Sequence, residues 1–318
     1  MRKNILPCCF FPTTIIIVDD DETFLEKLQQ MFLLEGITAK TFVEPGKALE
    51  FINAQNSLDL TRCYHTRVDV ADNHSVYETQ TDLSAIMKQA DDPHRSDSLS
   101  VIISDYHMPQ MNGIDLCHDI KLADVKKILL TAVAGDNVAV SAFNDGLIDQ
   151  FISKGAKHLA DQLIALVKAL QFALFAEQSL AVYKLYDNAI AQRPFLQQDD
   201  FIQWFKQLLI NHGICEFYLV TEFGLLDFVM IDNNNGKDTR YWLSIRDDRD
   251  MTALYDVAQS HGSTADILNQ LKSRRAMPVV TGDDDGNCSP DQWHIILQPA
   301  HKVMLPSQVV YYSLVEQV

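Results

Sequence analysis

The chain has 318 residues, a formal net charge of −17 and a hydrophobic share of 47%. This length and composition are typical of a globular protein with two domains and exclude a disordered chain. An acidic surface repels nucleic acid and anionic lipid, so we expect neither nucleic acid nor a membrane as a partner. The six cysteines show no regular spacing, which is typical of reduced thiols and predicts a cytoplasmic protein.

The first residues combine basic side chains with an apolar run and therefore resemble a signal peptide. Pro7 and Pro12 interrupt this run, and the apolar residues continue directly into a strand that ends at Asp19. We therefore expect no signal peptide. We also expect no membrane helix, because no apolar stretch approaches the roughly 20 residues that such a helix needs.

Apolar strands and amphipathic helices alternate through the first half of the chain. Nearly all-apolar strands indicate a parallel sheet that is covered on both faces. Five such alternations predict an α/β fold, a doubly wound parallel sheet of (βα)5 type. The expected strands span 13–18, 37–43, 99–105, 127–132 and 150–154, and the expected helices span 23–34, 45–52, 114–120, 137–144 and a segment from 158 onward.

A polar stretch at about 54–98 interrupts this alternation. A loop between a helix and a strand usually has about 2–6 residues, so we interpret the stretch as an insertion. Two readings remain open: a loosely ordered surface loop, or a subdomain that docks a partner. One short helix is expected within it, over residues 81–90.

Polar side chains end the expected strands of this sheet. Asp19 and Asp20 follow the first strand, Asp105 ends the third, Thr131 the fourth and Lys154 the fifth. The carboxyl ends of parallel strands share one edge, so these side chains are expected to converge. Three neighbouring carboxylates repel one another unless a cation joins them, and oxygen ligands suit Mg²⁺. The pattern predicts a carboxylate that accepts a phosphoryl group while a metal ion and a lysine neutralise charge.

At these positions the sequence is similar to the receiver domain of two-component response regulators. The similarity includes the run Asp105-Tyr-His-Met-Pro-Gln-Met-Asn-Gly113 and the Thr131-Ala132 pair, and it covers about residues 12–175 apart from the insertion. The resemblance implies that Asp105 is the phosphoacceptor and that a sensor histidine kinase supplies the phosphoryl group. It also implies a homodimer through the fourth helix, fifth strand and fifth helix.

The resemblance further implies a ligand set for Mg²⁺. Asp20 and Asp105 would bind the ion directly, Asp19 would act largely through water, and the main-chain carbonyl of His107 would complete the protein ligands. Thr131 and the aromatic Phe151 would form the switch pair, which responds to phosphorylation and biases the proposed dimer surface.

Three positions depart from the family pattern. Gly155 follows Lys154 where the family usually has proline, and the switch aromatic Phe151 is more often tyrosine in the family. His107, two residues beyond the phosphoacceptor, is expected to influence the lifetime of the phosphoryl group in a direction that the sequence leaves open.

The second half predicts a different architecture. We expect a receiver at 12–158, a helical connector at 159–191 and an α+β output domain at 192–318. In the output domain a period-two pattern predicts an antiparallel meander, with an Asn-Gly turn between its second and third strands. The expected strands span 215–220, 225–231, 240–245, 293–297 and 309–314, and the expected helices span 200–211, 251–260 and 264–273.

No output family is recognisable, so several functions stay open. We favour a module that binds a ligand or a protein, because no nucleophile–base spacing stands out. The alternative is an enzyme regulated by phosphorylation, and a third option is an atypical DNA-binding regulator. Weak metal candidates are the loop at 281–287, the pair His212 and Cys215, and the pair Cys63 and His65, none of which has a full set of ligands.

Overall fold

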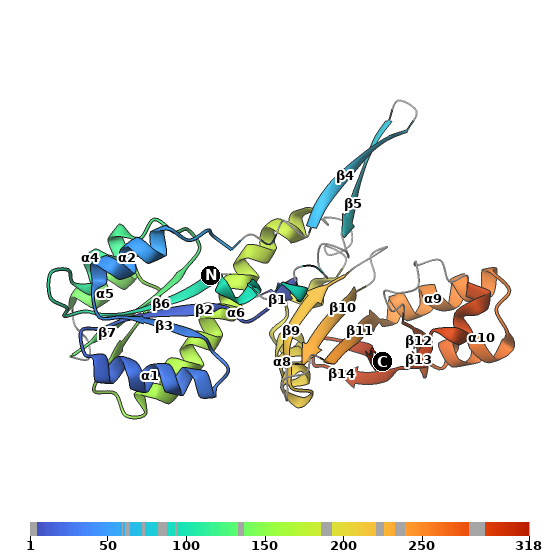
Figure 1. Cartoon of the computed structure of the whole chain (residues 1–318). Helices are drawn as coiled ribbons and strands as arrows, with labels where there is room; N and C mark the ends of the chain where they lie inside the picture. Colours follow the sequence, from blue (N-terminus) through green and yellow to red (C-terminus); the bar gives the residue numbers. More distant parts are fainter. Residues whose placement is uncertain are drawn as a thin grey trace. The chain divides into compact units, whose positions relative to one another are not determined.

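The computed structural model in Figure 1 divides the chain into two compact units. Residues 11–59 and 90–178 form one unit, and residues 1–10, 60–89 and 179–318 form the other. We call them the receiver unit and the output unit. The structure describes residues 5–58, 60, 64–71, 74–81, 88, 90–92, 94–132, 137–185, 193–220, 226–232, 239–279 and 290–317.

The receiver unit contains the predicted doubly wound sheet. Five strands pair in the order β3-β2-β6-β7-β8, and every pairing is parallel. β2 and β6 are buried along their whole length, in keeping with strands covered on both faces. The strands are β2 (Thr14–Val18), β3 (Ala39–Phe42), β6 (Leu99–Asp105), β7 (Lys126–Thr131) and β8 (Gln150–Ser153).

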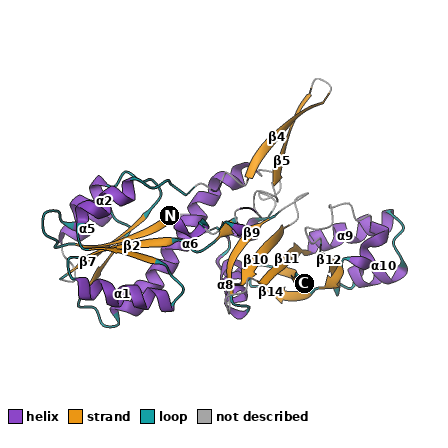
Figure 2. Ribbon diagram, in the orientation of Figure 1, coloured by secondary structure: helices purple, strands orange, loops and turns teal. Residues whose placement is uncertain are grey.

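Helices cover both faces of this sheet (Figure 2). On one face α1 and α6 bury Leu25, Leu28 and Leu163 against the strands. On the other face α2, α4 and α5 pack in two further apolar clusters. The helices are α1 (Glu22–Leu34), α2 (Pro45–Asn53), α4 (Gly113–Asp119), α5 (Asn137–Asn144) and α6 (Leu159–Leu185). The predicted fold class is therefore confirmed.

The insertion between α2 and β6 contains a β-hairpin. β4 (Tyr64–Ala71) and β5 (His74–Thr81) pair antiparallel along their full length. The expectation of a loosely ordered loop is therefore wrong for these residues. Most of the short helix expected over 81–90 lies outside the described residues, and a single 3-10 turn, η2 (Arg95–Asp97), precedes β6.

The output unit is built on a six-stranded antiparallel sheet with the order β1-β9-β10-β11-β15-β14. Its central strands form the predicted meander, while the residues of the expected Asn-Gly turn lie outside the described part of the chain. The strands are β1 (Cys9–Phe10), β9 (Ile214–Leu219), β10 (Leu226–Asp232), β11 (Thr239–Asp247), β14 (His301–Met304) and β15 (Val309–Glu316).

Helix α8 packs aromatic side chains on this sheet. Phe205 of α8 lies against Phe217 and Phe228, with ring centroids 5.1 and 5.3 Å away. The helical elements of the output unit include η3 (Pro194–Gln197), α8 (Asp199–Asn211), α9 (Asp248–Ser260) and α10 (Ala265–Lys272). An antiparallel sheet with separate helices is the predicted α+β architecture.

One expected strand of the output domain is wrong. Residues 293–297 were predicted as a strand, but they mostly belong to the 3-10 helix η5 (Pro290–Ile295). Trp293 and Ile296 are both buried, and this spacing of three residues places them on the same side of a 3-10 turn. The next residues form β13 (Leu297–Pro299), which pairs with β12 (Ala276–Pro278) in a separate two-stranded sheet that was not predicted.

One segment is apolar enough and long enough for a membrane helix, contrary to the expectation from the sequence. The segment Leu159–Tyr183 has a mean hydropathy of 1.5 and the length of a membrane-spanning helix. In the structure this segment is α6, which buries Leu163, Val167 and Leu170 against the parallel sheet. A core helix of a globular domain passes the same composition test, so this is weak evidence for a membrane span.

Candidate functional site

The carboxyl edge of the parallel sheet brings together the polar residues that the sequence predicts to converge. Asp19 follows β2, Asp105 ends β6, Thr131 ends β7 and Lys154 follows β8. The parallel register aligns these strand ends, and the main-chain N–H of Lys154 donates to the carbonyl of Thr131 at 2.7 Å. Residues that are distant in sequence thus share one edge.

The ammonium group of Lys154 joins two of the carboxylates. Its Nζ lies 2.6 Å from Oδ2 of Asp19 and 3.0 Å from Oδ1 of Asp105. Asp19 is fully buried and Asp105 is 5% exposed, while the Lys154 side chain is 27% exposed. The Asp105 carboxylate is therefore held beside a positive charge at the rim of the sheet.

Three carboxylates of this edge form a set that fits a divalent cation. Ligand oxygens of Asp19, Asp20 and Asp105 all lie within 4.8 Å of one another, and Asp20 is exposed to solvent. Among the described residues, this is the one such group of three metal-ligating side chains. Carboxylate oxygens with an open, solvent-facing side suit a hard cation that keeps some of its water.

Burial, hydrogen bonds and neighbouring charges shift the pKa values of Asp19 and Lys154. Burial raises the pKa of the Asp19 carboxyl above its usual value, and the contacts with Lys154 and with the N–H of Asp21 offset this only in part. Burial acts to lower the pKa of Lys154, but the hydrogen bonds and charges of Asp19 and Asp105 outweigh it and the net shift is upward. Lys154 therefore stays protonated at neutral pH.

The backbone around Asp105 is closely packed. Ser104 donates its hydroxyl to the carbonyl of Asp105 at 3.0 Å. Gly113 approaches that same carbonyl so closely that a Cβ there would lie 2.2 Å from it. Asn112 caps α4 by accepting hydrogen bonds from the N–H groups of Ile114 and Asp115. The loop after β6 can fold back only because residue 113 lacks a side chain.

The other predicted site residues lie around this edge. Thr131 is 1% exposed, and Phe151 is half-buried with its ring 6.2 Å from that of Phe143 on α5. The His107 side chain is exposed beside Tyr106. The N–H of Gly155 donates to the Ser153 hydroxyl at 3.3 Å, a bond that the proline usual in the family could not form. The roles predicted for these residues stay predictions.

The sequence reading did not single out Phe24. Its ring lies beneath Lys154, with Nζ 5.0 Å from the ring centroid. Phe24 belongs to the apolar stripe of α1, and nothing in that stripe distinguishes it from a core residue. The contact is visible only once α1 and the end of β8 are placed together.

The weaker metal candidates receive no support. The loop at 281–287 and the pair Cys63 and His65 lie outside the part of the chain whose side chains are described. His212 and Cys215 do not form a metal group, since the acidic trio of the receiver unit is the one group found among described residues.

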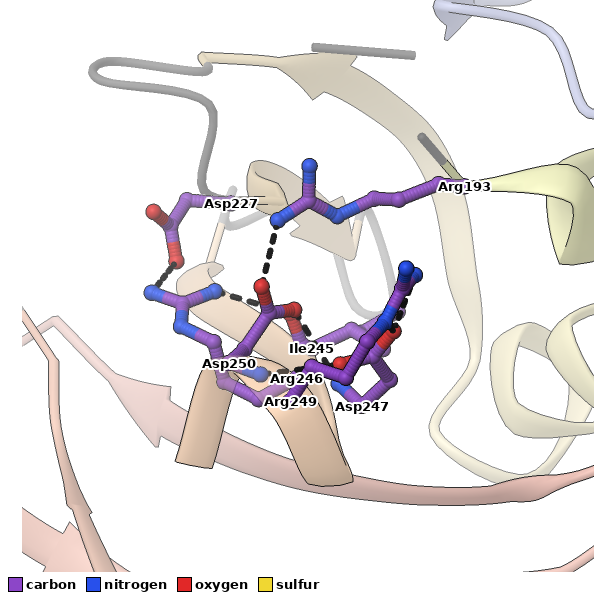
Figure 3. A network of polar contacts seen from close by, with 7 residues as sticks. All are labelled: Arg193, Asp227, Ile245, Arg246, Asp247, Arg249 and Asp250. Carbon is purple, nitrogen blue, oxygen red and sulfur yellow. Dashed lines mark hydrogen bonds and ion pairs between the residues drawn. The ribbon is translucent and has the colours of Figure 1, made fainter. Parts of the chain in front are cut away.

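A network of arginines and aspartates lies at the start of α9 in the output unit (Figure 3). Arg193 contacts Asp250 at 2.8 Å, and Arg246 contacts Asp227 of the neighbouring strand at the same distance. Asp247 and Asp250 exchange the two hydrogen bonds of a capping box. These are the contacts of a helix cap and of links between elements, so we assign the network a structural role.

Comparison with known proteins agrees with the fold of the receiver unit. Residues 70–168 match the family model of the response regulator receiver domain. The match begins within the insertion and leaves out Asp19 and Asp20, which directly follow β2 of the same parallel sheet. No curated protein matches the chain by sequence.

Among solved structures, the chain is similar to the response regulator LqsR of Legionella pneumophila, with 27% identity and a TM-score of 0.75 over 98% of this chain and 89% of that one. A weaker likeness is to an adenylate cyclase from Rhodopirellula baltica, with 17% identity and a TM-score of 0.37 over 56% of this chain and 98% of that one. Another is to a response regulator receiver domain protein from Clostridium thermocellum, with 17% identity and a TM-score of 0.33 over 50% of this chain and 94% of that one. Residues 70–168 thus match a response regulator receiver domain, and the chain shares its fold along nearly its whole length with a response regulator.

Proposed function

We propose that Asp105 accepts a phosphoryl group from a sensor histidine kinase and that its charge controls the output domain. The observation that supports this proposal is the contact of one lysine with two carboxylates, since Lys154 lies 3.0 Å from Asp105 and 2.6 Å from Asp19. An ammonium group in this position offsets the negative charge that builds up as a carboxylate oxygen bonds to phosphorus. Under this proposal residues 12–158 receive the signal, 159–191 connect and 192–318 respond.

The residues around Asp105 fit a bound Mg²⁺. Asp20, Asp105 and the main-chain carbonyl of His107 would bind the ion, and Asp19 would act largely through water. When bound, Mg²⁺ supplies positive charge next to the incoming phosphoryl oxygens. Asp105 provides the attacking oxygen, Lys154 neutralises charge, and the hydroxyl of Thr131 donates to a phosphoryl oxygen.

The proposed switch pair lies on β8, the edge strand of the sheet, and on its neighbour β7. Thr131 would move toward the phosphoryl group and Phe151 would turn inward, which would change the surface formed by α5, β8 and α6. Val138 and Phe143 of α5 are exposed on this surface, at 44% and 42%. We infer that two copies associate there.

Sedimentation of the full chain tests this association. A phosphoryl mimic such as beryllofluoride, added with Mg²⁺, should convert monomer to dimer, and Val138→Glu should prevent the conversion. An unchanged mass in the presence of the mimic would argue against phosphorylation-driven association.

For the output domain we propose binding of a ligand or a protein, in the cytoplasm. Regulated enzyme activity stays the alternative, and DNA binding is a weaker one. A thermal-shift screen of nucleotides and metabolites on the full chain should reveal a ligand by a raised melting temperature. Turnover of a screened compound would instead support a regulated enzyme. Retardation of DNA in a gel at low salt would support a DNA-binding regulator.

Labelling by a small phosphodonor tests the central proposal. With Mg²⁺ and acetyl phosphate the protein should gain one acid-labile phosphoryl group, and a chelator should abolish the gain. Asp105→Asn should not be labelled. Asp161→Asn is the matched control, because Asp161 is 78% exposed on α6 and should leave labelling unchanged. Labelling of Asp105→Asn at the wild-type level would refute the assignment.

A further inference from the structure

The first turn of α1 is tied to the acidic edge of the sheet. The N–H of Asp21 donates to Oδ1 of Asp19 at 3.0 Å, and the side chain of Asp21 accepts from the N–H of Phe24 at 3.0 Å. Asp21 is thus the N-cap of α1 and fixes where Phe24 leaves the backbone. The position of the Phe24 ring is set by the same short segment that supplies the acidic pair.

Apolar side chains of the receiver core also pack against the ring of Phe24. It is half-buried and packs against the apolar cluster that includes Ile17, Leu25 and Leu28. A ring in this position loses little further freedom when a partner binds its face. Lysine, in contrast, carries its charge on a flexible four-carbon stem.

The ring and the lysine meet at a distance typical of a cation–π contact. Nζ of Lys154 is 5.0 Å from the ring centroid of Phe24. A cation within about 6 Å of an aromatic face is attracted by the electron density of the ring, more strongly where solvent is partly excluded. The ammonium group therefore has the two carboxylates of Asp19 and Asp105 and one aromatic face around it.

We propose that Phe24 is a positioning residue for phosphoryl transfer, because its ring holds the Lys154 ammonium in place beside Asp105. The inference rests on the proposed function of Asp105. Charge stabilisation is most effective when the charged group is in place before the reaction starts. The Phe24 side chain is a hydrocarbon ring that can neither transfer a proton nor bond to phosphorus, so it acts through Lys154.

The chain contains a matched control for this contact. Lys40 lies over the ring of Phe51 at 4.8 Å, and Phe51 is likewise half-buried and packed on an apolar cluster. This second pair joins β3 to α2 and includes no residue of the acidic edge. Phe24→Leu and Phe51→Leu therefore remove the same kind of contact, and only one of the two changes affects Lys154.

Labelling rates at saturating acetyl phosphate and Mg²⁺ test the proposal on the full chain. Phe24→Leu keeps an apolar side chain without the ring face and should slow labelling about three- to tenfold, within the range of a partly desolvated cation–π contact. Phe24→Tyr and Phe24→Trp should restore the rate to within about twofold, and Phe51→Leu should match wild type. In a Lys154→Met background, Phe24→Leu should have no further effect.

A second measurement, by NMR, detects the contact between Phe24 and Lys154 without any phosphorylation. In protein with labelled lysine, ring currents should move the Lys154 ε-CH₂ resonance upfield, and Phe24→Leu should remove that shift. Wild-type labelling by Phe24→Leu, or equal slowing in the Lys154→Met background, would overturn the proposal. If wild-type protein takes no label while the resonance shift is present, the proposed function fails although the contact exists.

Discussion

Gly113 determines whether the loop after the phosphoacceptor can close. A Cβ at this position would lie 2.2 Å from the carbonyl oxygen of Asp105, 2.8 Å from Cδ1 of Leu129 and 2.9 Å from Oγ of Ser104. The first of these atoms belongs to the backbone of a buried strand and cannot turn away as a flexible side chain can. Any side chain at residue 113 must therefore displace Asp105 itself.

Gly113→Ala should lower the free energy of unfolding by about 2–3 kcal/mol, as overpacking of a closely packed site does. Labelling of Asp105 should fall as well, because its main chain moves. Gly46→Ala is the control, since nothing lies within 4 Å of a Cβ at this position on α2. Urea unfolding followed by circular dichroism compares the two, and an equal effect of both would contradict this account.

At the scale of elements, β7 runs from an ion-pair cluster at the amino-terminal ends of the strands to the proposed site at their carboxyl ends. Lys126 begins β7 and contacts Glu177 of α6 at 2.6 Å and Asp149 at 3.5 Å. The Lys126 side chain is only 7% exposed. Thr131 ends the same strand at the proposed phosphorylation edge. One short strand thus holds the proposed switch residue at one end and an anchor of α6 at the other.

Lys126→Met should destabilise the protein by about 2 kcal/mol, because the Asp149 side chain is only 16% exposed and loses its charged partner, whereas Glu177, at 36%, stays partly solvated. Lys168→Met serves as the matched variant. Lys168 also joins α6 to another element, through Glu35 at 2.7 Å, but both side chains are about half exposed. An exposed pair contributes at most about 1 kcal/mol. Similar midpoints of urea unfolding for the two variants would show that burial is not what matters.

At the scale of the whole molecule, the chain segments on both sides of the receiver unit belong to the output unit. Before the receiver, β1 adds a strand beside β9. After it, the end of α6 contacts the same N-terminal segment. Tyr183 donates to the carbonyl of Leu6 at 2.7 Å, and the Ser179 hydroxyl accepts from the N–H of Cys8 at 2.9 Å. The output unit therefore includes the chain segments that precede and follow the receiver unit in the sequence.

Tyr183→Phe should destabilise the output unit by about 1–2 kcal/mol, because the buried carbonyl of Leu6 loses its donor. Burial raises the pKa of the Tyr183 hydroxyl well above its usual value, so this group remains a donor at neutral pH. All three tryptophans lie in the output unit, and their fluorescence therefore reports its unfolding.

A double-mutant cycle sharpens this test. In protein that lacks residues 1–10, Tyr183→Phe should have no further effect, since its acceptor is gone. A loss of similar size in the shortened protein would show that Tyr183 stabilises the unit in another way.

The receiver could be predicted from the sequence because its signals are local. Apolar runs, helical stripes and turn residues mark each strand and helix, and the acids, threonine and lysine directly follow or end their strands. Since parallel strands align their carboxyl ends, the positions of Asp19, Asp105 and Lys154 follow from the order of elements alone. The meander of the output domain was predicted in the same way, from its period of two.

The remaining features depend on contacts between distant segments. β1 has two residues and becomes a strand only because β9 supplies its hydrogen bonds. By sequence, the apolar residues at 293–296 fit either a strand or a 3-10 turn, and only the burial of both Trp293 and Ile296 decides for the turn. By sequence, Phe24 has the pattern of an ordinary core residue, and its contact with Lys154 is visible only once α1 and the end of β8 are placed together. Local periodicity determined the elements and the charged edge of the receiver, whereas only tertiary packing decided which ring supports the lysine and which segments complete the output sheet.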